Sequence, residues 1–254
     1  CKGHDFDTSS LIQADGRFLK GTPFVGEKNI QEANEIVIDV LKSKNLLLSK
    51  NKYRHSFPHC WRHKTPLFFR ATPQWFISMD QNGLLDDCLK KIEEINWLPE
   101  WGKSRIDSMM ADRPDWCVSR QMHWGAPLPL FVDKISGELH PDSIKIIQAV
   151  ADKIETNGVE DWFSSDPKEF LGKDANKYEK ITDILDVWFD SGVSHSCAPD
   201  QIKTPYSPAD LYLEGSDQHR GWFQSSLITG LAMNSQSPYR TVLTHGFVVD
   251  ADGR

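Results

Sequence analysis

Three polar side chains, those of Glu214, Asp217 and Gln218, lie between two apolar segments of different period. The run Leu211 to Leu213 is typical of a short strand, and the apolar residues after Gly221 recur at helical spacing. In open parallel sheets, ligands bind beyond the carboxyl ends of strands, so this loop could hold a nucleotide or an amino acid. Gly215 would let a ligand approach the backbone closely. An ordinary hydrated loop is the alternative interpretation of the same pattern.

The amino-acid sequence of this loop resembles that of a known family. Leu213-Glu-Gly-Ser-Asp-Gln-His-Arg-Gly-Trp-Phe223 resembles the adenylate-binding loop of the isoleucyl-tRNA synthetases, class I aminoacyl-tRNA synthetases of bacterial type. Further stretches resemble the same family in the same order: His59-Cys-Trp-Arg-His-Lys-Thr-Pro66, Arg70-Ala-Thr-Pro-Gln-Trp-Phe-Ile-Ser78, Asp115-Trp-Cys-Val-Ser-Arg-Gln121, Asp186-Val-Trp-Phe-Asp-Ser-Gly192 and His245-Gly-Phe247. Matches that run almost from end to end are implausible by chance.

The resemblance implies an α/β fold, namely the second half of a class I synthetase Rossmann-like catalytic domain. It implies that residues 1–50 form the tail of an editing insertion, residues 51–112 form connecting strands and helices with a β-ribbon, and residues 113–254 form the catalytic half with an insertion at about 133–182. Cys1 is not an initiator methionine, and Arg254 closely follows a turn signal. We therefore expect an internal fragment of a longer chain.

The apolar periodicity supplies the elements that must position these motifs. It predicts helices over residues 30–44, 84–92, 103–111 and 142–157. It predicts strands at residues 46–48, 55–57, 67–69, 75–77, 116–118, 128–132, 184–189, 211–213 and 241–249. The four earliest of these strands would make up the connecting ribbon.

The resemblance also implies roles for individual residues. It assigns adenylate binding to Glu214, Gly215, Asp217, Gln218, His245 and Gly246. It assigns the walls of an isoleucine pocket to Trp188 and Trp222, although a single Trp is more often a core residue because aromatic side chains bury large areas. No residue is expected to be catalytic, because the substrate carboxylate itself attacks the α-phosphate and the protein positions the reactants and stabilises charge.

The parent protein implied by the resemblance uses ATP, with Mg²⁺ as part of the substrate complex, L-isoleucine and tRNA(Ile), and is expected to be a monomer. The two signature loops of class I synthetases, one of the His-Ile-Gly-His type and one of Lys-Met-Ser-Lys-Ser, are absent from the sequence. We therefore expect the chain alone to be inactive. A non-catalytic RNA-binding or interaction protein derived from a synthetase and a valyl-type synthetase are the alternatives.

The composition bounds the class of protein. The 254 residues are 39% hydrophobic, carry a net charge of -7, and contain no apolar run long enough for a membrane span or a signal peptide. Five cysteines are scattered without a paired framework, as in a reducing cytosol. We therefore predict a cytoplasmic protein that does not bind membranes. The acidic balance argues against indiscriminate nucleic-acid binding.

One interval departs from this acidic balance. Between Asp39 and Asp80 there is no Asp or Glu, but there are eight Lys or Arg residues. We expect Lys52, Arg54, Arg62 and Lys64 to face tRNA. A basic face that is merely solvated is the alternative.

Cys60 and His63, with His55 and His59 beside them, suggest a metal site. A structural zinc normally has four ligands in two well-spaced pairs, and a second pair is missing here. We therefore expect no zinc, and interpret the histidines as structural or tRNA-facing. Cys117 and Cys197 are expected to be small buried residues. His4 and Asp5 superficially resemble part of an editing signature and are interpreted as loop residues.

Overall fold

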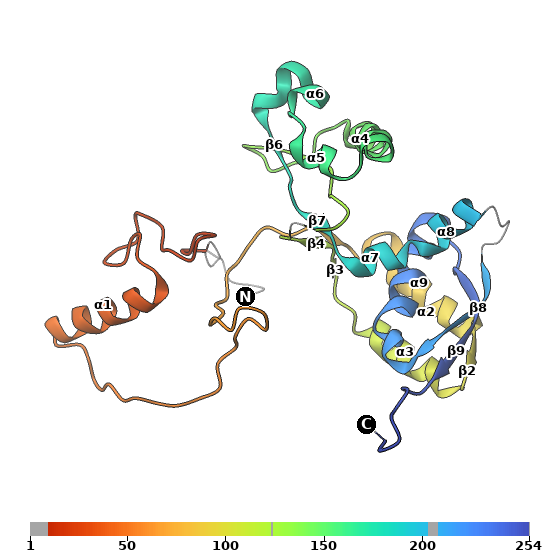
Figure 1. Ribbon diagram of the computed structural model, residues 1–254, viewed down its shortest axis with the longest axis horizontal. Helices are drawn as coiled ribbons and strands as arrows, with labels where there is room; N and C mark the ends of the chain where they lie inside the picture. Colours follow the sequence, from red (N-terminus) through yellow and green to blue (C-terminus); the bar gives the residue numbers. More distant parts are fainter. Residues whose placement is uncertain (1–9, 123, 203–207, 254) are drawn as a thin grey trace. The chain divides into compact units, whose positions relative to one another are not determined.

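The computed structural model describes residues 10–122, 124–202 and 208–253, so His4 and Asp5 lie outside the described residues. The chain divides into two compact units, Cys1–Pro73 and Gln74–Arg254 (Figure 1). The boundaries expected after residues 50 and 112 remain predictions. Within the described ranges, no helix combines the length and the apolar character that crossing a bilayer requires.

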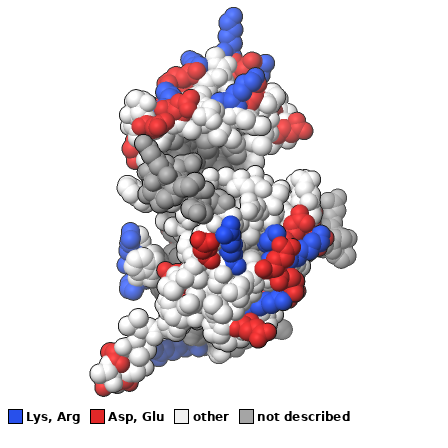
Figure 2. Space-filling view, turned by 90° about the vertical axis from the view of Figure 1, so that its right-hand side faces the viewer, with Lys and Arg blue, Asp and Glu red and all other residues white. Residues whose placement is uncertain are grey.

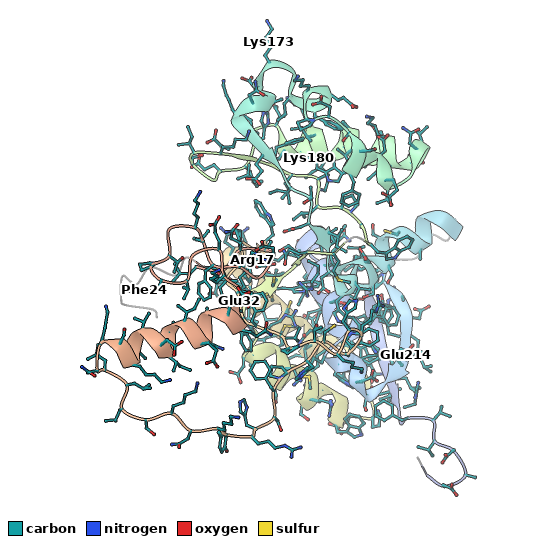
Figure 3. All side chains as sticks on the ribbon, turned by 60° about the vertical axis from the view of Figure 1, so that its left-hand side comes forward. Arg17, Phe24, Glu32, Lys173, Lys180 and Glu214 are labelled. Atoms are coloured by element: carbon teal, nitrogen blue, oxygen red, sulfur yellow. The ribbon has the colours of Figure 1, made fainter. Side chains whose placement is uncertain are left out.

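The first unit contains one helix, α1 (Ile30–Ser43), in its described part. Asn29 caps the helix by accepting a hydrogen bond from the Glu32 N–H at 2.9 Å, and the Glu32 carboxylate reaches back to the Asn29 N–H. This reciprocal arrangement satisfies two backbone donors at the start of the helix, where Figure 3 labels Glu32. The helix ends at Ser43 with Lys44 as its C-cap, and Asn45 adopts a left-handed φ of 55°. The predicted helix and its end are confirmed.

The connecting ribbon differs from the expectation. Residues 46–75, all of which are described, contain no strand, only an isolated bridge between His59 and Pro66. The ribbon is reduced to β1 (Phe76–Ile77). Three prolines in this interval, Pro58, Pro66 and Pro73, remove backbone N–H donors. A segment with alternating apolar residues forms a stable strand only where another strand pairs with its backbone.

The second unit is built on a parallel sheet in the order β2 (Asn96–Leu98), β9 (Tyr239–His245), β8 (Ala209–Gly215). One buried core joins residues of this sheet to α2 (Leu84–Glu94), α3 (Trp101–Ala111) and α9 (Trp222–Asn234). The predicted helices and the strand at 211–213 are confirmed, whereas the strand predicted over residues 241–249 ends at His245 and residues 246–249 are not part of it. Strand β2 was not predicted, because the three residues between the preceding helix and Pro99 are too few to show an alternation of apolar and polar side chains.

The two faces of the parallel sheet differ in burial. On one face, Trp97 and Tyr212 are each 5% exposed and Val242 is fully buried. On the other face, Leu98, Leu211 and Leu213 are 45%, 47% and 51% exposed. Parallel sheets are normally covered on both faces, so this apolar face is unusual for a complete α/β domain.

Short elements connect the sheet to the rest of the second unit. Strand β1 pairs antiparallel with β3 (Trp116–Cys117), and β4 (Ser119–Arg120) pairs antiparallel with β7 (Ile184–Leu185). Residues 116–118 are therefore not part of the parallel sheet. The turn η1 (Gln81–Gly83) leads into α2, and α7 (Val187–Gly192) and α8 (Ser194–Ile202) follow β7. Residues 187–189, predicted as part of a strand, form the first residues of α7 instead, and Asp186 is the N-cap of this helix.

The expected insertion has a core of its own. It contains β5 (Phe131–Asp133), α4 (Ser143–Asn157), α5 (Glu160–Ser164), α6 (Lys168–Leu171), η2 (Gly172–Lys177) and β6 (Tyr178–Lys180). Phe131, Val150 and Trp162 are at most 1% exposed and belong to a cluster separate from that of the sheet. The Lys180 ammonium donates to the carbonyls of Trp162 and Ser165 (Figure 3). The predicted helix 142–157 is confirmed as α4.

Candidate functional site

The carboxyl ends of β8 and β9 bring two of the sequence motifs together. In the parallel register, Glu214 is opposite Thr244 and Gly215 is opposite His245. Glu214 and His245 are exposed at this edge, where Figure 3 labels Glu214. The Glu214 carboxylate accepts a hydrogen bond from the Gly215 N–H at 3.2 Å. A carboxylate and an imidazole thus lie at successive register positions of the same sheet edge, the edge where α/β sheets bind ligands.

The turn η3 (Ser216–His219) carries the other polar candidates. The Gln218 amide donates to Asp217 Oδ2 at 3.0 Å, and its oxygen accepts from the Trp222 N–H at 2.9 Å. A β-carbon added to Gly215 would lie 2.8 Å from Asp217 Oδ1, so the turn folds tightly against this glycine. Gly246 follows the strand and is exposed, with open space around its α-carbon.

The two tryptophans expected to form a pocket come from neighbouring helices. Trp188 lies on α7 and is 42% exposed, and its ring would be 2.8 Å from a β-carbon at Gly221. Trp222 begins α9, and its indole N–H donates to the Ser191 carbonyl at 3.0 Å and lies 3.1 Å from the Ser194 hydroxyl. Helices α7 and α9 pack closely, since a β-carbon at Gly192 would lie 3.1 Å from the Ser225 carbonyl oxygen. Both rings therefore lie next to η3.

A buried polar network that sequence reasoning missed supports this arrangement. Asp186 is 4% exposed, accepts a hydrogen bond from the Trp116 indole at 3.2 Å, and pairs with Arg120 at 3.1 Å. Arg113 donates to Gln224 of α9 and lies over the Trp116 ring. Burial lowers the pKa of Arg113 from its ordinary value. The network links the starts of α7 and α9; the sequence signal was the cluster of charged residues on both sides of Trp116.

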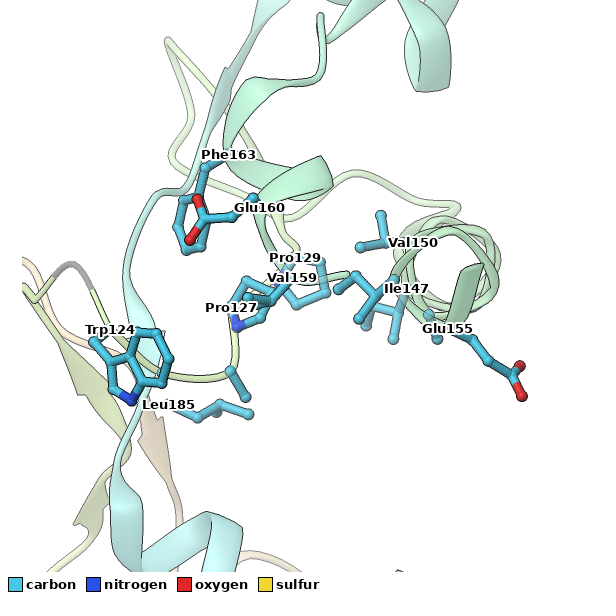
Figure 4. A pocket seen from close by; sticks show the side chains of 14 residues that line it. Trp124, Pro127, Pro129, Ile147, Val150, Glu155, Val159, Glu160, Phe163 and Leu185 are labelled. Carbon is cyan, nitrogen blue, oxygen red and sulfur yellow. The ribbon is translucent and has the colours of Figure 1, made fainter. Parts of the chain in front are cut away.

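An apolar cavity of about 710 Å³ lies between the base of the insertion and its helices (Figure 4). Its lining includes Trp124, Pro127, Ile147 and Phe163, and its charged lining residues are Glu155 and Glu160. Carboxylates repel phosphate, and apolar side chains cannot bind it. The cavity is therefore unsuited to a nucleotide, whereas the edge formed by β8 and β9 carries polar groups.

The basic interval belongs to the first unit. Lys42 and Lys50 pair with Asp39 and Glu35 at 3.7 and 3.2 Å. In the described part of the chain, Lys52, Arg54, Arg62 and Lys64 form no ion pair with a carboxylate, and all four are exposed. On the face of the molecule shown in Figure 2, by contrast, acidic and basic side chains lie intermingled.

Aromatic rings follow the same interval at every second residue. The ring centroids of Tyr53 and His55 are 5.9 Å apart with planes at 15°, and those of His55 and Phe57 are also 5.9 Å apart. Phe57 and His59 continue the series at 6.1 Å. Lys52 and Arg54 alternate with these rings, so cations and aromatic faces occur together on one extended segment.

Cys60 and His63 are close enough to interact. The Cys60 sulfur lies 3.5 Å from His63 Nδ1 and accepts the His63 backbone N–H at 3.4 Å. No set of three or more His, Cys, Asp or Glu side chains able to hold a metal was found in the described ranges.

The expectation that Cys197 is buried is wrong: it is exposed, and Cys117 is half-buried. Cys197 belongs to α8, a short helix of mixed polar and apolar residues.

The parallel strands, with polar groups at their carboxyl edge and a close helix pair beside them, define an α/β unit, and comparison with protein families gives its class. The model of class I tRNA synthetases (I, L, M and V) matches residues 20–254, and the chain belongs to this family.

Three similar curated relatives are all isoleucine–tRNA ligases. That of Thioalkalivibrio sulfidiphilus is 58% identical over 96% of this chain and 26% of its own length. Those of Alcanivorax borkumensis and Coxiella burnetii are 56% and 57% identical over 100% and 99% of this chain, and 27% of their own length. The chain thus spans about a quarter of the length of these relatives. A crystal structure of a ternary complex of Agrobacterium radiobacter LeuRS with tRNA and LeuAMS matches with a TM-score of 0.40 and 18% identity, over 55% of this chain and 20% of that one.

Proposed function

We propose that this chain is the second half of the catalytic domain of an isoleucine–tRNA ligase. The parent protein would activate L-isoleucine with ATP to isoleucyl-adenylate and transfer the amino acid to tRNA(Ile). The observation that carries the proposal is the register that places Gly215 opposite His245 at the carboxyl edge of the parallel sheet. The names of the relatives, at 56–58% identity, support isoleucine as the amino acid.

The polar edge would hold the adenylate. Glu214 and Asp217 would accept hydrogen bonds from the ribose or from the amino group of the substrate. The Gln218 oxygen already accepts from the Trp222 N–H and one amide hydrogen already donates to Asp217, so the second amide hydrogen is the part left to donate to a ligand. Gly215 would let the ligand lie against the backbone, and His245 with Gly246 would border the nucleotide. Mg²⁺ would arrive bound to ATP as part of the substrate.

No protein nucleophile is needed in this reaction. The isoleucine carboxylate attacks the α-phosphate, pyrophosphate leaves, and the rate depends on how the two reactants are held. Trp188 and Trp222 would hold the isoleucine side chain beside the polar edge. An apolar pocket discriminates weakly against a side chain that lacks one methylene, and the isoleucyl enzyme is the standard worked case of that limit.

The exposed face of the sheet supports the proposal that this is half of a domain. Leu98, Leu211 and Leu213 are about half exposed, although parallel sheets bury both faces. The remainder of the catalytic domain in the parent protein would cover them. For the same reason, the chain by itself would be inactive. We propose that the parent is a cytoplasmic monomer.

The basic interval would face the single-stranded end of the tRNA. Unpaired bases stack on aromatic side chains, and cations alongside neutralise phosphates. The alternation of Lys52 and Arg54 with the rings of Tyr53, His55 and Phe57 offers both kinds of contact. Arg62, which lies over the Trp61 ring at 5.1 Å, and Lys64 would extend it.

The test is isoleucine-dependent exchange of pyrophosphate into ATP by the parent protein, measured beside valine. Exchange that is more efficient with isoleucine is expected. Exchange that is more efficient with valine would indicate a valyl-type enzyme. Binding of tRNA without exchange for either amino acid would instead indicate a non-catalytic RNA-binding protein and would overturn the proposal.

A further inference from the structure

The side chain of His219 differs from its neighbours in the polar turn. Asp217 is exposed and Gln218 is partly exposed, whereas His219, the last residue of η3, is fully buried. Its ring lies 6.1 Å from that of Trp97, 5.7 Å from that of Trp101 and 5.4 Å from that of Phe223, measured between centroids. Residues of β2, α3 and α9 thus enclose one imidazole, which anchors the turn in the core.

The hydrogen bond of His219 defines its protonation. Its Nδ1 lies 2.9 Å from the Ser216 carbonyl oxygen at the start of the same turn. A carbonyl can only accept, so Nδ1 carries the hydrogen, and a neutral ring leaves Nε2 as an acceptor. The bond joins the first and last residues of η3, with Asp217 and Gln218 between them.

The other ring nitrogen of His219, Nε2, lies in a closely packed part of the core. His219 Nε2 and Thr244 Oγ1 are both buried and have no hydrogen-bond partner in the described structure. A β-carbon added to Gly102 would lie 3.1 Å from Nε2 and 3.8 Å from Thr244 Oγ1. Thr244 is opposite Glu214 in the sheet and precedes His245. The buried side of the imidazole therefore lies near Thr244, the residue of β9 that precedes His245.

We propose that His219 is the positioning residue of the adenylate site: as a neutral imidazole it holds the Ser216 carbonyl and thereby sets the orientation of Asp217 and Gln218 toward the nucleotide. The inference rests on the proposed function, because it takes the η3 turn as the part that binds the adenylate. His219 itself touches no substrate. Gly102 is required because any larger residue would press on Nε2.

Electrostatics of the surroundings keep the ring neutral. Burial lowers the pKa of His219, and the charge of Arg105 on α3 acts in the same direction, while the Ser216 carbonyl and Asp217 act against it. The three enclosing rings carry no charge. Because the folded pKa is below the ordinary value of about 6.5, the neutral ring stabilises the turn fully above that pH and this contribution declines as the pH falls below it.

A matched pair of substitutions tests the proposal in the parent protein. Asn and Leu have nearly the same shape, but Asn can place an N–H where Nδ1 was. We expect His219→Leu to raise the KM for ATP in pyrophosphate exchange at least tenfold more than His219→Asn, with kcat less affected. The wild-type KM for ATP should rise below about pH 6.5 as His219 becomes protonated. The rise should be smaller in His219→Asn, where His245 is the histidine of the site that remains to be protonated. Equal KM values for ATP in the two variants would overturn the proposal. So would a rise of this KM at low pH that is as large in His219→Asn as in the wild type.

A second variant avoids the imidazole. Gly102→Ala should favour helix α3 by propensity, yet its new methyl group would press on Nε2. We expect a higher KM for ATP without loss of thermal stability, whereas an unchanged KM would contradict the positioning role. Wild-type protein that exchanges no pyrophosphate would instead refute the proposed function, so the two failures are distinguishable.

Discussion

Trp222 and Tyr212 stack face to face, with ring centroids 4.0 Å apart and planes inclined by only 9°. Tyr212 is buried on β8, and it covers one face of the indole. The indole N–H is held at the Ser191 carbonyl. The ring is thus fixed in place before any substrate binds, which is what a pocket wall requires.

Replacing this ring should weaken isoleucine binding in the parent protein. We expect Trp222→Ala to cost about 3 kcal/mol or more, because a partly buried aromatic ring and its contacts are removed. The KM for isoleucine in pyrophosphate exchange should rise roughly a hundredfold. Trp222→Phe, which keeps a ring on Tyr212, should have a smaller effect. Trp61→Ala, at a ring 76% exposed in the other unit, is the control. Normal isoleucine kinetics in Trp222→Ala would remove this ring from the site.

The chain alone should not catalyse pyrophosphate exchange, because it holds the polar edge but neither signature loop that would stabilise the phosphates. The purified 254-residue chain is assayed with isoleucine and ATP, beside its Glu214→Gln variant. We expect both to remain at background. Turnover by the chain that Glu214→Gln abolishes would show that half of the domain suffices.

The buried carboxylate of Asp186 should stabilise the second unit. Asp186→Leu would leave the Trp116 indole N–H and Arg120 without their acceptor, which typically costs about 1–3 kcal/mol for a neutral donor and more for a charged one. Asp186→Asn keeps one oxygen in place and should cost less. Urea unfolding of both variants measures the difference. If the two were equally stable, the network would be irrelevant to the packing of α7.

Sequence periodicity predicted the long helices because α2, α3 and α4 each bury apolar residues at helical spacing, and α1 has the same spacing although only Ala33 is buried there. It failed between residues 46 and 75, where alternating apolar residues have no partner strand and prolines interrupt pairing. It also failed for short elements such as β2, whose three residues are strand only because β9 accepts them. For the site, two motifs that resemble the family predicted Glu214 and His245, and the parallel register brings both to the same edge of the sheet. The burial of His219 could not be predicted, because a histidine in a polar loop has no sequence feature that distinguishes core from surface.

The cysteines should differ in reactivity. The backbone N–H groups of His63 and Arg62 and the His63 side chain lower the pKa of Cys60, whereas burial raises the pKa of Cys88 to about 12. Since the thiolate is the nucleophile, Cys60 should be alkylated by iodoacetamide at pH 7 faster than the exposed Cys197, and Cys88 last. Peptide mass spectrometry gives the order. His63→Ala keeps the backbone donors and should slow Cys60 only in part; a Cys60 no faster than Cys197 would contradict the lowered pKa.

The basic interval should neutralise phosphates when tRNA binds. Replacing Lys52, Arg54, Arg62 and Lys64 by Gln in the parent protein removes four exposed cations that form no ion pair in the described structure. For each phosphate that is no longer neutralised, the dependence of log affinity on log salt should flatten by about 0.7 to 0.9. The matched control replaces Lys42 and Lys50, which are paired with Asp39 and Glu35, and should change the slope less.

Two further measurements separate binding from folding in that experiment. A thermal melt must show that the fourfold variant is as stable as the wild type, since exposed cations on a segment without strands should contribute little to stability. Replacing Tyr53 and Phe57 by Leu should lower tRNA affinity without altering the salt slope, because stacking releases no counterions. If the fourfold variant folds normally and keeps the wild-type slope, the tRNA does not contact this segment, and the basic interval is a solvated surface.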